Sequence, residues 1–185
     1  MRFIGVDPSF TRTGLSILNS EGGVELLTSI KTSAKKSTFE RQREITETIL
    51  SYVRGNDVVC LEDFGVSARF APSGRFVERI EICGMLKLTL SARTGLPWVS
   101  IAPNMLKSFI AGKGSAKKEE VMASVRNVWK VDVGNDDEAD AFALAAYART
   151  TYFEDPRYVR KTDKFLEYGD NSFAMKRIRF LSTSL

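Results

Sequence analysis

Two short apolar runs in this chain each end in an acidic residue. The run from Phe3 to Val6 leads into Asp7, and the run from Val58 to Leu61 leads into Glu62. The second run is continuous and rich in β-branched residues, which indicates a strand covered on both faces. An acid at the end of a buried strand is costly unless a cation neutralises it. If the two strands pair in parallel, Asp7 and Glu62 emerge together at the carboxyl edge of the sheet, where open α/β sheets usually bind ligands.

The remaining apolar pattern predicts an α/β fold with a mixed five-stranded sheet flanked by helices. Strands are expected over 13–18 and 24–31, joined as a hairpin by a turn-rich stretch, and again over 58–61 and 98–101. Helical spacing predicts helices over 38–53, 77–92, 117–130 and 136–152, with a short one opening at Pro103. We expect one domain over residues 1–152 and a basic, aromatic C-terminal extension over 153–185.

Composition limits the available chemistry. The 185 residues are 43% hydrophobic, enough for one globular domain with a real core. The chain contains no histidine, which excludes His-dependent triads, His-ligated zinc and a His general base. Catalysis would therefore use carboxylates, Lys, Tyr, Ser or activated water. The net charge of +4 suits a polyanionic partner.

The cysteines and the N-terminus bear on location. Cys60 and Cys83 lie in apolar patterns without a CxxC pair, which predicts buried thiols in a reducing compartment. The opening MRFIGVDPSF becomes polar too early for a signal peptide, and no apolar run approaches membrane-spanning length. We expect a cytoplasmic protein without membrane contact.

A second acidic group opens the helix over 136–152. Asn135 can cap this helix together with Glu138, and acids in the first turn interact favourably with the helix dipole. That structural explanation covers Asp137 but not Asp140, which lies one turn further on the same face, beside residues expected to pack inward. A metal explains a carboxylate in that position better than solvation does.

Together, Asp7, Glu62, Asp137 and Asp140 predict a divalent metal site. Mg²⁺ or Mn²⁺ suits oxygen ligands, and two such ions about 4 Å apart are clamped between carboxylates in nucleases and polymerases. Taken singly, Asp7 could instead start an Asx turn before Pro8, and Glu62 could be a solvated strand end. The set of four points to phosphodiester chemistry.

A basic segment lies between the two acidic groups. Lys107, Lys113, Lys117 and Lys118 surround the stretch Gly112-Lys113-Gly114-Ser115 just before a predicted helix start. Exposed backbone N–H groups there form a plausible phosphate cradle. The stretch is not a Walker A loop, because the first glycine of that motif is missing. The alternative is a solvated charge run.

Four segments resemble, in order and spacing, the motifs of the RuvC family of Holliday junction resolvases. They span roughly residues 2–150 and are IGVDPSFTRTG, VVCLE, APNMLKSFIAGKGSAKKEEV and NDDEADAFALA. The resemblance implies a ribonuclease H-like fold and a catalytic, metal-binding tetrad of Asp7, Glu62, Asp137 and Asp140. It places Lys107 and Lys118 near the cleaved strand, with Lys118 stabilising charge on the phosphate. It also implies a homodimer that cuts two strands of a four-way DNA junction symmetrically, with Mg²⁺ or Mn²⁺ and two ions per active site.

The chain departs from the family in the loop after Glu62. The family often carries an aromatic residue there that probes the junction centre, and here Phe64, Phe70 and Phe76 compete for that role. Phe70, flanked by Arg69, is the preferred residue for stacking on an unpaired base, and Arg69 and Arg75 are expected to contact DNA. The extension after residue 150 fits a divergent phage-encoded member working in the host cytoplasm.

Two other functions remain open from the sequence. One is a non-cleaving protein that binds branched DNA, although all four acids are present. The other is a phosphotransferase of the actin and hexokinase superfold, for which the chain is short.

Overall fold

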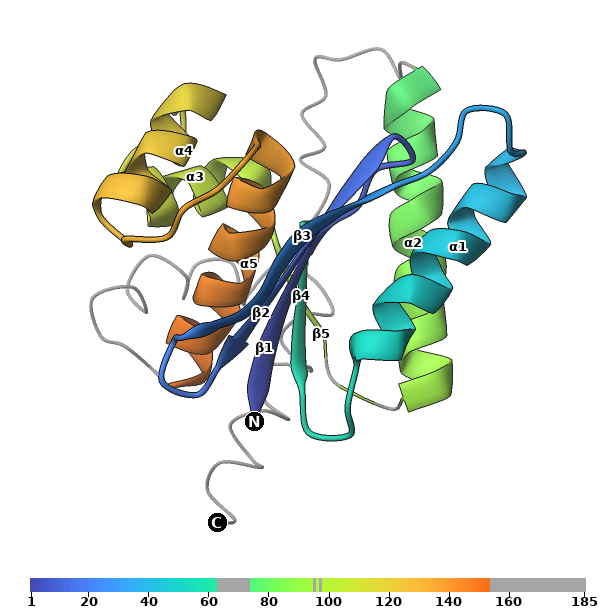
Figure 1. Ribbon diagram of the computed structural model, residues 1–185, viewed down its shortest axis with the longest axis horizontal. Helices are drawn as coiled ribbons and strands as arrows, with labels where there is room; N and C mark the ends of the chain where they lie inside the picture. The colour runs from blue at the N-terminus through green and yellow to red at the C-terminus, as the bar shows by residue number, and fades with distance from the viewer. Residues whose placement is uncertain (63–73, 95, 97, 154–185) are drawn as a thin grey trace.

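The computed structural model of the protein describes residues 1–62, 74–94, 96 and 98–153. Within these residues a sheet lies between two helical layers, with α1 and α2 on one face and α5, α3 and α4 on the other (Figure 1). The chain runs through β1 (Arg2–Asp7), β2 (Arg12–Asn19), β3 (Val24–Lys31), α1 (Thr38–Tyr52), β4 (Val58–Glu62), α2 (Gly74–Thr94), β5 (Trp98–Ile101), α3 (Pro103–Ala111), α4 (Lys118–Asn127) and α5 (Asp136–Tyr152).

The sheet is mixed and has the order β3-β2-β1-β4-β5. The first three strands form an antiparallel meander, whereas β4 joins β1 in parallel and β5 joins β4 in parallel. The five-stranded mixed sheet and its hairpin, both predicted from the sequence, are confirmed. In β1 and β4, Val6 pairs with Leu61, so the residue that follows each of them leaves the same edge of the sheet.

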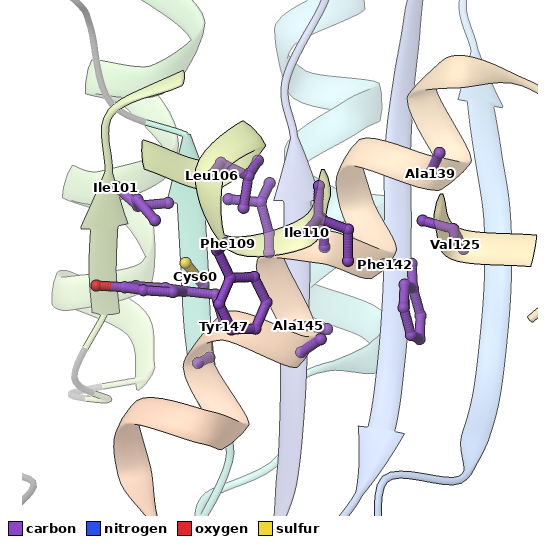
Figure 2. Packing of buried hydrophobic residues seen from close by; sticks show 14 of the residues in the cluster. Cys60, Ile101, Leu106, Phe109, Ile110, Val125, Ala139, Phe142, Ala145 and Tyr147 are labelled. Atoms are coloured by element: carbon purple, nitrogen blue, oxygen red, sulfur yellow. The ribbon is translucent and has the colours of Figure 1, made fainter. Parts of the chain in front are cut away.

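Alternate residues of the central strands face two separate hydrophobic layers. Val6 packs with the apolar faces of α1 and α2, whereas Cys60 packs beneath α3 and α5. Figure 2 shows the second layer, in which Phe109 and Tyr147 meet edge to face with ring centroids 5.5 Å apart. Both cysteines are free and buried, as predicted.

Helix α5 lies directly on β1 and β2 because two strand residues have no side chain. A Cβ atom on Gly5 would stand 2.0 Å from the Ala141 carbonyl oxygen, and one on Gly14 would stand 2.0 Å from the Asp137 carbonyl oxygen. Glycine inside a strand often marks such a close backbone approach. Since Gly14 pairs with Asp7 across the sheet, this contact sets the start of α5 beside the end of β1.

Two helix boundaries differ from the prediction by three residues. Helix α2 begins at Gly74, three residues before the apolar periodicity starts. Helix α4 ends at Asn127 rather than Lys130, because Trp129 turns into the core with its ring 5.8 Å from that of Phe142. Lys130 then takes a left-handed φ of 59°, which a continuing helix does not allow.

Some predicted residues lie outside the described ones. They are Phe64, Arg69 and Phe70, the side chains of Arg75 and Phe76, and residues 154–185. The first residue of the predicted extension, Phe153, packs its ring 5.7 Å from that of Phe3. In the described part of the chain, no helix has the length and apolar character needed to cross a membrane.

Candidate active site

Asp7 and Glu62 lie next to each other at the carboxyl ends of β1 and β4. They follow the matched pair Val6 and Leu61, and they are only 6% and 7% exposed. The turn after β1 is closed by Thr13, whose hydroxyl donates to the Ser9 carbonyl oxygen at 2.7 Å and accepts from the Ser9 N–H at 3.2 Å. Ser9 and Thr13 close this turn, and the Asp7 carboxylate instead accepts from Arg79. The Glu62 carboxylate accepts from the same arginine.

Helix α5 supplies the other two acids of the predicted set. Its start is fixed by Asn135, whose side chain accepts from the Glu138 N–H at 3.1 Å, as predicted. The Glu138 carboxylate accepts from the Gly134 N–H at 2.8 Å rather than from the N–H of the capping residue Asn135. This cap and the contact with Gly14 place Asp137 and Asp140 on the side of the helix nearest Asp7, so that both charges act on the Asp7 carboxyl group.

Two arginines that the sequence did not single out hold these acids. Arg79 of α2 donates to Asp7 Oδ1 at 2.8 Å and also to Glu62 Oε2, so it bridges the pair. Arg12, the first residue of β2, donates to Asp137 and lies 3.6 Å from Asp136. The predicted hairpin could have located Arg12 near the sheet edge, whereas no local pattern distinguishes Arg79 from other charged residues of its helix.

Burial and mutual repulsion raise the pKa values of three acids of the site. Burial, reinforced by the Glu62 charge, raises the pKa of Asp7 well above its usual value. Burial also raises the pKa of Glu62, although Arg79 opposes the rise. For Asp140, burial and then the Glu62 charge raise the pKa to about 7. Such shifts are common where several carboxylates share a functional site.

Two of the predicted lysines lie close to these acids. Lys118, at the first position of α4, donates to Asp136, and this bond raises the pKa of the lysine and lowers that of the aspartate. The charges of Lys107 on α3 and of Lys118 both oppose the burial that raises the pKa values of Glu62 and Asp140. The structure therefore brings Lys107 and Lys118 together with the four acids.

The other two lysines of the basic segment have a different surrounding. Lys113 lies 2.5 Å from Glu120 Oε1, and the Lys117 N–H donates to Glu120 Oε2 at 2.8 Å. The glycines of the segment are required by the backbone. Gly112 ends α3 with a left-handed φ of 79°, and a Cβ on Gly114 would stand 2.9 Å from a carbonyl oxygen of α3. Lys113 and Lys117 thus form the solvated outer rim of the α3–α4 loop.

The donor set fits a hard divalent cation, because the site offers only carboxylate oxygens. In the arrangement seen among the described residues, no three acidic or thiol side chains stand close enough to share one ion. In this arrangement Arg79 pairs with Asp7 and Glu62, and Arg12 pairs with Asp137. The donor chemistry therefore fits a metal, whereas in the arrangement seen here arginines neutralise three of the acids.

The chain is similar to known proteins over most of its length. Residues 3–147 match the family model described as crossover junction endodeoxyribonuclease RuvC. The RuvC protein of Parasynechococcus marenigrum is 30% identical over 154 residues, which cover 78% of this chain and 96% of the relative. The Thermus thermophilus RuvC structure superposes with a TM-score of 0.66 at 25% identity, covering 83% of this chain and 97% of that one.

A second structure of the Thermus thermophilus protein, in complex with a Holliday junction substrate, superposes with a TM-score of 0.62 at 22% identity. The superposed region covers 83% of this chain and 96% of the chain in that structure. These likenesses confirm the ribonuclease H-like fold that the sequence motifs implied.

Proposed function

The chain belongs to the RuvC family, and from that premise we infer that it is a crossover junction endodeoxyribonuclease that resolves four-way DNA junctions by paired, symmetrical nicks. The observation that carries this function is the buried pair Asp7 and Glu62 at the ends of adjacent parallel strands, with Asp137 and Asp140 facing them from α5. A relative of the same fold has been captured with a Holliday junction as its substrate.

The four carboxylates are the groups that would hold Mg²⁺ or Mn²⁺, one or two ions per site. Divalent metal supplies activation of the attacking water and neutralisation of charge on the scissile phosphate. The chain's own contribution is to fix the acids on rigid elements, two on strand ends and two on a capped helix. This rigidity keeps the oxygens in position without reorganisation during the reaction.

Lys118 stabilises charge on the transition-state phosphate, and Lys107 assists it. Lys118 is 69% exposed at its side chain and reaches Asp136 at the mouth of the site, so it can exchange that carboxylate for a DNA phosphate. Both lysines already act electrostatically on Glu62 and Asp140. In this position the two ammonium groups would bind the phosphate more strongly as negative charge develops on it in the transition state.

DNA binding extends beyond the acids along the basic surface. We propose that Lys113 and Lys117 on the outer rim contact backbone phosphates, and that Arg69, Phe70 and, from the first turn of α2, Arg75 reach the branch point. Phosphate contacts supply most of the affinity and carry no sequence information.

A four-way junction has two equivalent strands to cut, so paired nicks require two active sites related by a two-fold axis. The exposed face of α2 suits a second copy of the chain. Ile80 and Leu88 on that face are 42% and 66% exposed, and Gly84 between them has open space around its Cβ position. A glycine between two apolar residues allows two such helices to cross closely. We propose that the homodimer forms through this face of α2 and that the protein works in the cytoplasm.

The direct test is cleavage of a labelled four-way junction in Mg²⁺, with a linear duplex of the same arm sequence as control. The protein should nick two opposite strands of the junction at symmetrical positions and leave the duplex intact. Asp7→Asn should abolish cleavage and leave junction binding within a few-fold of wild type. Binding without any cleavage by the wild type would instead identify a branched-DNA binding protein.

A further inference from the structure

Arg79 occupies the position of a cation between two buried acids. The same guanidinium nitrogen lies 2.8 Å from Asp7 Oδ1 and also bonds Glu62 Oε2. The side chains of both acids are 9% exposed, whereas that of Arg79 is 41% exposed. Arg79 therefore covers the pair from the solvent side.

The backbone under Arg79 is anchored, although its side chain can leave. The next buried positions of α2, Ile82, Cys83 and Leu86, pack into the layer between that helix and the sheet. The Arg79 side chain is 41% exposed, far more than the acids that it covers, so its release does not require α2 to leave the sheet.

We propose that Arg79 is a resident counter-ion that holds Asp7 and Glu62 until a divalent metal displaces it, so that it stabilises the metal-free protein and weakens metal binding. This inference rests on the proposed function, in which these two acids are metal ligands. Asp7 Oδ1 and Glu62 Oε2, the oxygens that accept from Arg79, are candidate metal ligands, and a metal that binds through them competes with the guanidinium. Displacement also leaves the guanidinium at the mouth of the site, where DNA must enter.

The test measures Mn²⁺ binding by calorimetry without DNA, at pH 8, for the wild type, Arg79→Gln and Asp7→Asn. Arg79→Gln should lower the Kd for Mn²⁺ by about 10- to 100-fold, the value of a charge-assisted contact that no longer has to be broken. In chelator, its Tm should fall by about 3 to 10 °C. Saturating Mg²⁺ should close this gap.

The matched control is Arg93→Gln, which removes another arginine of α2. Arg93 pairs with Glu47 at 2.7 Å, and both side chains are more than half exposed, so the Kd for Mn²⁺ should equal that of wild type. An unchanged or higher Kd in Arg79→Gln, with an unchanged Tm in chelator, would overturn the proposal. Should Arg79→Gln fold only in the presence of Mg²⁺, the role as counter-ion is supported.

If Arg79→Gln does not fold even with Mg²⁺, Arg79→Lys decides. It keeps the charge, but its shorter side chain brings the ammonium less close to both acids, so the Kd for Mn²⁺ should still fall; a Kd equal to that of wild type would overturn the proposal. Asp7→Asn separates this inference from the proposed function. If Asp7→Asn leaves Mn²⁺ binding unchanged, the proposed metal site itself is wrong. If Asp7→Asn weakens binding and Arg79→Gln does not strengthen it, only the role of Arg79 is wrong.

Discussion

Gly14→Ala tests whether close contact between β2 and α5 sets the geometry of the active site. The added Cβ would stand 2.0 Å from the Asp137 carbonyl oxygen and 2.7 Å from its carbonyl carbon, both of them backbone atoms. Relief of this overlap requires the start of α5 to retreat by about 1 Å, because non-bonded heavy atoms do not approach below roughly 3 Å. Asp137 and Asp140 would retreat with it, away from Asp7.

The expected cost has two parts. Overpacking of this kind lowers the free energy of unfolding by roughly 1–3 kcal/mol. A displacement of about 1 Å in a catalytic group can lower the rate about 100-fold, which exceeds the effect of partial unfolding. The two parts are separated by single-turnover cleavage of a four-way junction with excess enzyme and by urea denaturation of the same preparation.

Gly55→Ala is the matched control, since no atom lies within 4 Å of the Cβ position at Gly55 and its turn precedes β4, at the end of that strand opposite Glu62. It should cleave and unfold as wild type does. If Gly14→Ala cleaves as fast as Gly55→Ala, the backbone contact does not position the acids and the reasoning fails.

Three other changes test separate features. Arg2→Met should lower the free energy of unfolding by about 3–5 kcal/mol in urea denaturation, because it leaves Asp57 buried without the guanidinium that bonds it at 2.7 and 3.1 Å; a loss below about 1 kcal/mol would contradict this. Asp140 keeps its proton in the folded, metal-free protein up to about pH 7 but loses it near 3.8 when unfolded, so stability in chelator should fall as the pH rises between these values. Asp140→Asn should flatten that fall and raise the Tm at pH 8 while cleavage is lost, and an unchanged pH profile of Tm would refute the assignment. Leu88→Glu should convert a dimer into a monomer in light scattering, and a dimer that persists would place the interface elsewhere.

The order of strands and helices follows from the sequence because it depends on local patterns. The apolar run before Glu62 and the hairpin signals after Asp7 are short-range features, and the structure confirms the sheet that they predict. The cap at Asn135 is equally local, since its donor and acceptor lie three residues apart. Two boundaries differ for separate reasons. Helix α2 begins at Gly74, before its apolar periodicity starts, and α4 ends at Asn127 because Trp129 packs against Phe142, a residue distant in sequence.

The sequence by itself indicated that Asp7 and Glu62 end two buried strands, because a charged residue that closes a buried apolar run is conspicuous without a partner, and the structure confirms that placement. Only the tertiary structure decided what neutralises them. Arg79 is 72 residues from Asp7 along the chain and meets it through the packing of α2 against the sheet. The contact of Gly14 with Asp137 likewise joins residues far apart in sequence. Such contacts depend on how close two elements can pack, a property of the folded backbone that no local pattern of residues specifies.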